Sequence, residues 1–230
     1  MTGPAHATAI VLAAGAGLRL GADEPKAFVS IGGRPLVAIA AAASAASKAV
    51  GFLVVAVPPG TEERAREVLA DIEVPVTIVP GGATRQESVL LALAGVPDGV
   101  SVVVCHDAAR PFARPDLFSA VIDAIGDETD GAVPVVPIPD TVKRVQDGRV
   151  VGTESREGLA LAQTPQAFRL EALAEAHTRA SESSIEVTDD AGVLEWAGYH
   201  VVAVDGDPRN FKITTPADLL RAQVRVEGGG

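Results

Sequence analysis

Short apolar runs alternate along the chain with longer stretches that have the spacing of helices. The apolar runs predict strands over residues 8–12, 52–57, 75–79, 101–105, 131–136 and 200–204. The stretches between them predict helices over residues 35–48, 61–70, 84–94, 115–125, 170–180, 188–197 and 215–226. Near-continuous apolar sequence, such as Val102-Val103-Val104, is typical of strands buried on both faces. The alternation therefore predicts an α/β fold in which helices flank a mostly parallel, Rossmann-like sheet.

One segment, residues 141–154, breaks this alternation. It places Asp147-Gly148, a strong hairpin-turn signal, between two β-prone runs. Basic side chains interrupt both runs: Lys143, Arg144 and Arg149. Because neither run has a clean apolar face, and an isolated hairpin is marginally stable in water, we predict a protruding β-hairpin arm that packs against a second subunit. A solvated surface hairpin is the alternative.

The length and composition are those of one α/β domain. The chain has 230 residues, of which 47% are apolar and 3% aromatic, so we expect a core of Val, Leu, Ile and Ala. We predict a single domain over residues 1–230, with residues 138–160 as the arm for dimerisation. The single cysteine, Cys105, excludes an intrachain disulfide.

The charge and the apolar segments narrow the function classes. A formal net charge of −11 disfavours nonspecific nucleic-acid binding, which relies on a basic surface. An anionic substrate stays possible because a local cluster of Arg and Lys can override the global sign. No signal peptide is evident at the N-terminus, and polar residues interrupt the apolar region 36–57. We therefore expect a cytoplasmic protein without a membrane span.

The stretch from Leu12 to Lys26, LAAGAGLRLGADEPK, follows the first predicted strand. It opens with small residues: Ala13, Ala14, Gly15, Ala16 and Gly17. Small residues let a backbone approach a ligand closely, and exposed N–H groups in such a loop can hold phosphate oxygens. Arg19 and Lys26 bring two cations to the same loop. This combination suits a polyphosphate that gains charge in a transition state.

Two common nucleotide-binding patterns do not fit this loop. The pattern GxxxxGK[ST] is absent, and GxGxxG fails because Leu20 stands where the third glycine is required. The second predicted strand ends in Val55-Ala56-Val57-Pro58, so the acid that would bind a ribose is missing. A plain strand-to-helix turn remains the alternative to phosphate binding.

A second glycine-rich turn, Gly81-Gly82, opens a predicted helix. Thr84 and Glu87 stand three residues apart, as in a capping box, which explains both of them. The box explains neither Arg85 nor Ser88, which makes these two residues candidates for ligand contact.

The predicted strand 101–105 leads into the motif HDAARP, residues 106–111. An Asp at the carboxyl end of a strand is well placed to hold Mg²⁺, a hard ion that prefers carboxylate and phosphate oxygens. For Asp107, capping of the following turn is the alternative. Since ligands of open α/β sheets bind beyond the carboxyl ends of the strands, we expect this loop and the Leu12–Lys26 loop to meet in one crevice.

The C-terminal part of the chain adds further polar candidates. Arg156 and Thr164, the latter in the run QTPQ, suit a phosphate or a polyol. The run TDDA, residues 188–191, is typical of a helix N-cap with an acidic first turn. Thr215 before Pro216 predicts a helix start. Lys212, just before it, could point into the crevice, although a lysine in such a place is usually a solvated surface charge.

These motifs together resemble the 2-C-methyl-D-erythritol 4-phosphate cytidylyltransferase family. LAAGxGxR…PK, GGxxRxxS, HDAARP, QTPQ, TDDA and NxKxT occur in the family's order over nearly the whole chain. Ala27 stands where the family commonly has Gln, and Leu161 where an aromatic residue is frequent. Neither departure touches a charged role. The resemblance implies a nucleotidyltransferase-type sheet, Mg²⁺ as cofactor and a homodimer.

The resemblance also implies the reaction. CTP and 2-C-methyl-D-erythritol 4-phosphate would give 4-diphosphocytidyl-2-C-methyl-D-erythritol and pyrophosphate, a step of non-mevalonate isoprenoid biosynthesis. A phosphate monoester is already ionised near pH 7 and needs no general base, so we expect His106 to order its loop. Two alternatives are a cytidylyltransferase for another alcohol or sugar phosphate, such as ribitol 5-phosphate, and a non-catalytic nucleotide-binding regulator.

The resemblance assigns roles to individual residues. The expected catalytic residues are Arg19, Lys26, Arg156 and Lys212. The expected nucleotide-binding residues are Ala13, Ala14, Gly15, Gly17, Gly82, Arg85, Ser88, Asp107 and Ala108. The expected substrate-binding residues are Arg110, Thr141, Arg156, Thr164, Thr188 and Lys212. Asp107 is the expected metal ligand, and the arm is expected to bring Thr141 and Arg156 to the other subunit.

Overall fold

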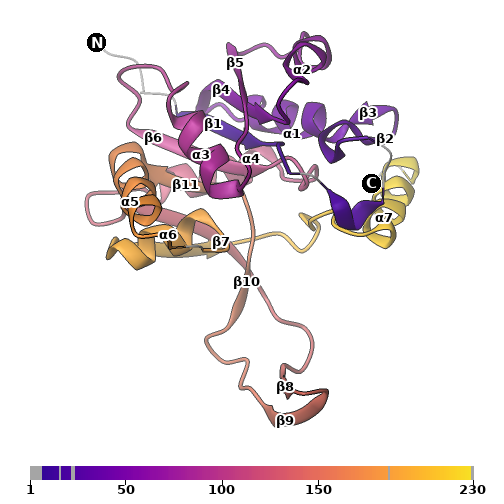
Figure 1. The fold of residues 1–230 in the computed structure, drawn as a ribbon, viewed down its shortest axis with the longest axis vertical. Helices are drawn as coiled ribbons and strands as arrows, with labels where there is room; N and C mark the ends of the chain where they lie inside the picture. The colour runs from indigo at the N-terminus through magenta and orange to yellow at the C-terminus, as the bar shows by residue number, and fades with distance from the viewer. Residues whose placement is uncertain (1–6, 16, 22–23, 186, 229–230) are drawn as a thin grey trace.

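An eight-stranded sheet runs through the centre of the protein in the order β10-β7-β11-β6-β1-β4-β5, with β12 paired to β7 (Figure 1). The structure is a computed structural model that describes residues 7–15, 17–21, 24–185 and 187–228. The strands of the sheet are β1 (Ala7–Leu12), β4 (Val50–Val57), β5 (Val76–Pro80), β6 (Val102–Asp107), β7 (Gly131–Pro137), β10 (Ala160–Ala162), β11 (Gln166–Arg169) and β12 (Val201–Asp205).

Most strand pairs in this sheet are parallel, as the sequence predicts. β1 pairs in parallel with β4 and β6, β4 with β5, and β7 with β12. The predicted strands are all present. β10 and β11 are additional strands that the apolar pattern did not predict, and they pair antiparallel with β7 and β6. β11 lies between β6 and β7, so the sheet is mixed at the side from which the arm leaves.

Helices cover both faces of the sheet and confirm the predicted α/β fold. One face carries α1 (Leu36–Ala45), α2 (Glu62–Val68) and α4 (Pro115–Asp123). The other carries α3 (Arg85–Leu93), α5 (Leu170–Glu182) and α6 (Asp190–Ala197). Since successive side chains of a strand point to opposite faces, Ala9 and Val11 of β1 enter the first core and Ile10 enters the second.

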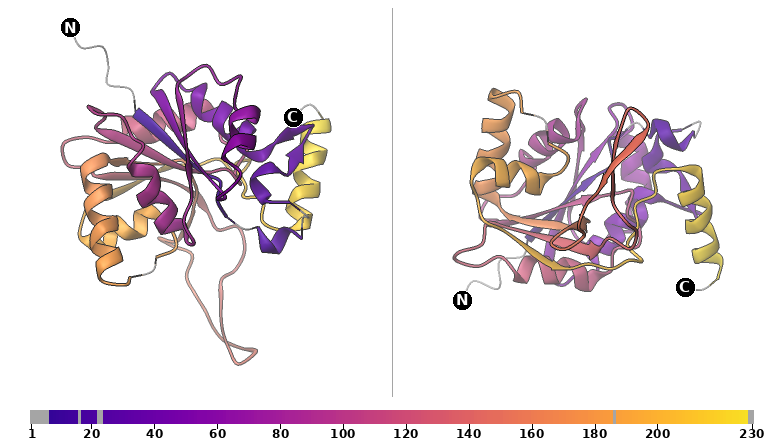
Figure 2. Two further views of the ribbon diagram at one scale, coloured as in Figure 1. Left: turned by 45° about the horizontal axis from the view of Figure 1, so that its top comes forward. Right: turned by 90° about the horizontal axis from the view of Figure 1, so that it is seen from below.

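The last helix, α7 (Pro216–Glu227), lies on the opposite side of the molecule from α5, as the yellow and orange ribbons of Figure 2 show. It packs through Ala222 on a third, smaller apolar cluster with Leu36 and Ile213. Short elements complete this end of the fold: the 3₁₀ helices Leu18–Leu20 and Lys26–Phe28, and the strand pair β2 (Ser30–Ile31) and β3 (Arg34–Pro35). All of the predicted helices are therefore present.

The helix starts follow the capping signals. The Thr84 side chain accepts a hydrogen bond from Glu87 N at 3.0 Å, which makes it the N-cap of α3. The Glu87 carboxylate accepts from Ala83 N at 2.7 Å instead of from the cap residue, so the capping box is incomplete. In α7, Thr215 and Asp218 form a complete box.

The arm is a separate two-stranded sheet of β8 (Lys143–Gln146) and β9 (Arg149–Thr153) that extends from the body (Figure 1). Asp147 and Gly148 have φ of 49° and 75°, the two positive values that a tight I′ hairpin turn requires. The predicted hairpin is therefore confirmed. Several apolar side chains of the arm are more than half exposed: Val145, Val150 and Val151.

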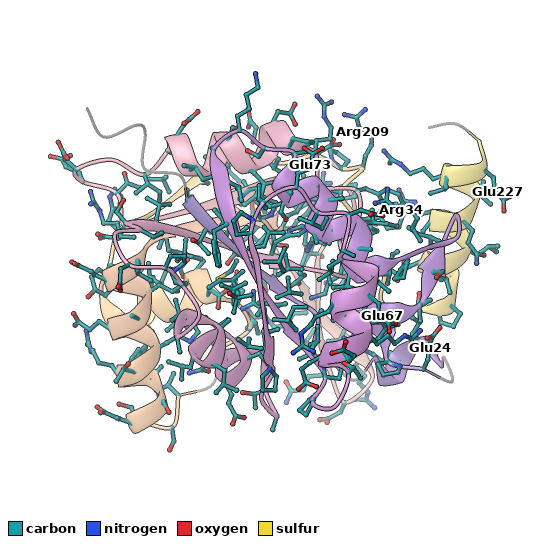
Figure 3. The ribbon with its side chains drawn as sticks, turned by 90° about the horizontal axis from the view of Figure 1, so that it is seen from above. Glu24, Arg34, Glu67, Glu73, Arg209 and Glu227 are labelled. Atoms are coloured by element: carbon teal, nitrogen blue, oxygen red, sulfur yellow. The ribbon has the colours of Figure 1, made fainter. Side chains whose placement is uncertain are left out.

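Exposed carboxylates lie at several places on the outer surface, in keeping with the excess of acidic residues in the sequence. Figure 3 labels four of them, Glu24, Glu67, Glu73 and Glu227, each at an exposed position. In the part of the chain that the structure describes, every helix is too short or too polar to cross a membrane.

Candidate functional site

A cavity of about 650 Å³ opens where β1 and β6 end, beside the first turn of α3. Its size is typical of a pocket for a small molecule. Its walls come from the loops after β1 and β6, the turn before α3 and the segment before α7. The predicted site residues that line it are Ala13, Ala14, Gly15, Gly17, Arg19, Lys26, Gly82, Arg85, Ser88, Asp107, Ala108 and Lys212. The loops that we expected to converge do meet in one crevice.

The other predicted site residues do not line this cavity. They are Arg110, Thr141, Arg156, Thr164 and Thr188. Arg110 donates to Asn210 O at 2.9 Å and to Ala162 O at 3.2 Å, so its guanidinium ties backbone segments together. Arg156 donates to the carbonyl groups of Ile138 and Pro139 at the base of the arm. Thr141 and Thr188 are exposed. The roles of all five residues as substrate contacts stay predictions.

Close packing requires glycine at two positions beside the cavity, Gly17 after β1 and Gly81 before α3. Gly17 has φ of 64°, and a Cβ added to it would lie 2.5 Å from Lys26 Cβ. A Cβ on Gly81 would lie 2.2 Å from Ala14 Cβ, so the two glycine-containing loops touch. At Gly15 an added Cβ would meet nothing within 4 Å among the described residues, so this part of the loop faces open space. Ala16 lies outside the described residues.

Asp107 closes the inner end of the cavity. It is 8% exposed; Lys212 Nζ lies 2.6 Å from Oδ2, and Arg85 Nε lies 3.4 Å from Oδ1. Burial alone would raise the pKa of the Asp107 carboxyl, but the charges of Arg85 and Lys212 outweigh burial and hold this pKa well below its usual range. Asp107 is therefore an anion that holds two cations at the cavity wall.

Arg85 also contacts a second carboxylate behind the cavity. Its Nη2 lies 2.7 Å from Oδ2 of Asp190, the first residue of α6. The other oxygen of Asp190 lies 3.1 Å from His177 Nε2 on α5, and both residues are completely buried. Burial would raise the pKa of Asp190, but Arg85 and the hydrogen bond from His177 lower it overall. The contacts Lys212–Asp107–Arg85–Asp190–His177 form one continuous network, which we call the Asp107–Asp190 network.

His106 and Thr164 anchor the end of β6. Thr164 Oγ1 accepts a hydrogen bond from Asp107 N at 3.0 Å and donates to His106 Nδ1, also at 3.0 Å, because the hydrogen of the neutral ring lies on Nε2. His106 Nε2 lies 3.2 Å from Arg110 O and donates to it. Burial lowers the pKa of His106 to about 4. These contacts support the prediction that His106 orders its loop.

Two buried amides hold the segment that carries Lys212. Asn210 Nδ2 donates to Thr164 O at 2.8 Å, and Gln163 Nε2 donates to Asp207 O at 2.9 Å. Gln163 Oε1 accepts in return from Asp207 N at 3.2 Å. The run QTPQ and the segment 206–214 are thus joined by side chain-to-backbone bonds, which fixes the starting point of the Lys212 side chain.

Sequence reasoning missed the part that Asp190 and His177 play. The run TDDA predicts a helix cap, and Asp189 does cap α6 by accepting from Gly192 N at 3.1 Å. An acidic first turn accounts for the second acid, Asp190, as well, so the run gave no signal of its buried ion pair. Nothing in the local pattern around His177 singled it out.

The charge state of Lys26 depends on its surroundings in the cavity. Burial lowers its pKa, and the nearby positive charges of Lys212 and Arg19 lower it further, while Asp107 acts in the opposite direction. A lowered pKa means that the ammonium form is less favoured than in an exposed lysine until an anion enters the cavity. A bound phosphate group would therefore stabilise the ammonium form of Lys26 more than it would stabilise that of an exposed lysine.

Comparisons with known proteins agree with this architecture. A family model described as IspD, 2-C-methyl-D-erythritol 4-phosphate cytidylyltransferase, matches residues 7–228. A protein of Frankia casuarinae named 2-C-methyl-D-erythritol 4-phosphate cytidylyltransferase is 45% identical over 216 residues, which are 94% of this chain and 79% of that protein.

Solved structures are also similar. The 2-C-methyl-D-erythritol 4-phosphate cytidylyltransferase of Thermus thermophilus is 34% identical with a TM-score of 0.81, over 96% of this chain and 99% of that one. The 4-diphosphocytidyl-2C-methyl-D-erythritol synthase of Anaerococcus prevotii is 28% identical with a TM-score of 0.85, over 96% of each chain. The residues matched by the family model include all of the helices and strands that the structure describes, from β1 to α7.

The environment of Lys26 can be tested directly, because the chain has few lysines: Lys26, Lys48, Lys143 and Lys212. We expect an NMR titration of ¹³C-methylated lysines to show that Lys26 loses its proton below the ordinary pH for a lysine. In Lys212→Met the removal of a neighbouring positive charge should raise the pKa of Lys26. Titration of Lys26 at the ordinary value in the wild type would contradict the buried, cation-rich environment.

Proposed function

The chain belongs to the 2-C-methyl-D-erythritol 4-phosphate cytidylyltransferase family, and we propose that the cavity at the ends of β1 and β6 is where it binds CTP. The protein is a nucleotidyltransferase that joins CTP to 2-C-methyl-D-erythritol 4-phosphate in the non-mevalonate pathway. One observation carries the assignment of the cavity: cationic side chains from separate elements surround a loop of small residues. They are Arg19, Lys26, Arg85 and Lys212.

The loop after β1 would hold the triphosphate. Its backbone N–H groups and the open space beside Gly15 suit phosphate oxygens, and Arg19 and Lys26 stand at the same loop. The cytidine would lie toward the turn before α3. There Ser88 Oγ accepts from Gly82 N at 3.1 Å and donates to Thr84 O at 2.9 Å, which stiffens the turn. A rigid turn of small residues can present backbone edges to a base.

In the reaction an oxygen of the acceptor phosphate attacks the α-phosphorus of CTP in line. The bond from that phosphorus to the bridging oxygen breaks, and pyrophosphate leaves with the electron pair. Arg19 and Lys26 would stabilise the charge that develops on the α-phosphate and the leaving group. Lys212 and Arg156 would hold the incoming phosphate. The ionised phosphate needs no general base, and His106 does not line the cavity.

The cavity fits a magnesium ion that arrives with the nucleotide. The described residues contain no group of three or more His, Cys, Asp or Glu side chains that could hold a metal ion alone. Mg²⁺ in nucleotide sites commonly takes one or two carboxylates and several phosphate oxygens, and Asp107 is a carboxylate that lines this cavity. Among the described residues its Oδ1 has only the 3.4 Å contact with Arg85 Nε, which leaves lone pairs available. When bound, the ion supplies positive charge to the phosphates.

A homodimer would complete the acceptor site through the arm. The arm exposes Val145, Val150 and Val151, and such a strand pair gains stability by packing on another surface. Thr141 and Arg156 lie at its base and do not line the cavity of their own chain. A cytoplasmic location, as predicted from the sequence, is part of the same proposal.

The first test concerns the two cations of the loop after β1. Lys26→Ala and Arg19→Ala should each lower kcat by about two decades or more, the scale of lost transition-state charge stabilisation, and weaken CTP binding less. Pyrophosphate release from CTP and the acceptor is the measurement. Arg34→Ala removes an exposed arginine outside the cavity and serves as the control. Near-normal turnover of either folded cavity variant would remove that residue from the mechanism.

The second test concerns Asp107. Asp107→Asn should raise the Mg²⁺ concentration needed for half-maximal activity, because the amide is a weaker ligand than the carboxylate. The matched control is Lys212→Met, which breaks the same ion pair but leaves the carboxylate. It should lower activity without raising the Mg²⁺ requirement. An unchanged Mg²⁺ dependence in Asp107→Asn would show that the carboxylate holds only protein cations.

The third test concerns sharing of sites between subunits. A chain with Arg156→Ala and a chain with Lys26→Ala, each inactive alone, are combined into a purified heterodimer. If Arg156 serves the partner, one site carries both defects and the other carries neither. Activity should then return to as much as about half of the wild type, on the logic of one intact site in two.

The homodimers of each variant, mixed without subunit exchange, are the control for this experiment. A verified heterodimer without recovered activity would contradict the shared site. A monomer by sedimentation of the wild type would contradict the dimer itself.

A further inference from the structure

A histidine on α5 lies at the inner end of the Asp107–Asp190 network, remote from the cavity wall. His177 is fully buried, and its Nε2 lies 3.1 Å from Asp190 Oδ1. Among the described residues its Nδ1 has no hydrogen-bond partner. A hydrogen on Nδ1 would be a buried donor without an acceptor, so the contacts place the hydrogen on Nε2, directed at the carboxylate. His177 does not line the nucleotide cavity.

We propose that His177 is a positioning residue for nucleotide binding, which acts on Arg85 through Asp190. The inference rests on the proposed function in one respect, that Arg85 contacts CTP. His177 fixes the torsion of the Asp190 carboxylate, and the carboxylate in turn sets where the guanidinium of Arg85 lies.

The distances show which carboxylate governs Arg85. Arg85 Nη2 lies 2.7 Å from Asp190 Oδ2, whereas Arg85 Nε lies 3.4 Å from Asp107 Oδ1. Asp107 is in addition held by Lys212 at 2.6 Å. The closer and fully buried partner, Asp190, therefore exerts the stronger hold on the guanidinium. Any rotation of its carboxylate moves the point to which Arg85 is drawn.

The backbone of Asp190 is already fixed by other contacts, so its side-chain torsion is the remaining freedom. Gln166 Nε2 donates to Asp189 Oδ2 at 2.7 Å, and Gln166 Oε1 accepts from Ala191 N at 3.3 Å. These bonds pin the first turn of α6 to β11. The oxygen that faces α5 has His177 as its hydrogen-bond donor. The buried thiol of Cys105 also contacts this carboxylate, but it is a weak donor. Without the His177 donor the carboxylate would lose its strong hydrogen bond on the α5 side, and it would turn toward Arg85 and draw the guanidinium away from the cavity.

The experiment measures CTP binding by the full-length enzyme, by calorimetry with Mg²⁺ and without acceptor. His177→Leu keeps an apolar filling but removes the donor, and should weaken CTP binding on the order of tenfold, as expected for a lost hydrogen bond to a charged group. His177→Gln keeps an N–H of similar reach and should restore binding to near the wild-type value. In steady-state kinetics the loss should fall mainly on KM for CTP, with kcat less affected.

Two controls separate positioning from general destabilisation. Leu173→Val alters the buried face of the same helix but keeps His177 and its hydrogen bond to Asp190, and should leave CTP affinity unchanged even if it lowers Tm. Arg85→Ala should weaken CTP binding, and adding His177→Leu to it should weaken binding no further, because the path through Arg85 is already removed. If His177→Leu does not fold, Asp190→Asn takes its place in the same cycle.

Each result decides a different point. If Arg85→Ala weakens binding and His177→Leu does not, the positioning role of His177 is overturned while the nucleotide site stands. Additive losses in the double variant, or failure of His177→Gln to restore affinity, would also overturn it. If Arg85→Ala leaves CTP affinity unchanged, the proposed nucleotide contact of Arg85 is wrong, and the inference that depends on it falls with it.

Discussion

A carboxylate buried at the end of a central strand must be compensated by cations from elsewhere in the chain. Leaving such a group unpaired costs several kcal/mol. Asp107 receives Arg85 from α3 and Lys212 from the segment before α7, which stand 22 and 105 residues away in sequence. Both pairs form only when the sheet, α3 and that segment are all in place. The electrostatic requirement of one buried acid therefore couples the assembly of the cavity to the completion of the fold.

The flexible side chain of Lys212 would pair poorly with Asp107 if its backbone were free to move. Asn210 and Gln163, both buried, remove that freedom by bonding to main-chain groups of the neighbouring segment. Ile213 N also donates to Ala109 O at 2.8 Å, directly beyond β6. Ordering the long side chain then requires only its own torsions to be fixed, which reduces the entropy lost when it pairs with Asp107.

The sequence predicts features that depend on local periodicity or on the ends of strands. It does not predict which side chains from distant parts of the chain pair with one another. Apolar runs located β1 and β6, and small residues beyond them located the cavity. β11 escaped notice because its four residues, QAFR, carry too little pattern to distinguish a strand from a loop. The pairing of Asp190 with Arg85 and His177 joins three helices, and no spacing rule relates α3, α5 and α6. The arm's hairpin was readable from Asp147-Gly148, whereas the surface on which we propose that it packs belongs to a second chain and has no pattern in the arm's own sequence.

The Asp107–Asp190 network also determines where the cavity is positive. Asp107 and Asp190 together offset two cations, Lys212 and Arg85, so these four side chains are close to neutral as a group. Within the described residues, the ion pairs include no carboxylate partner for Arg19 or Lys26, both of which line the cavity. The uncompensated positive charge is therefore concentrated at the loop after β1. A chain with a net charge of −11 can attract a triphosphate at that loop because field strength near a ligand depends on the closest charges, and distant surface acids are screened by salt.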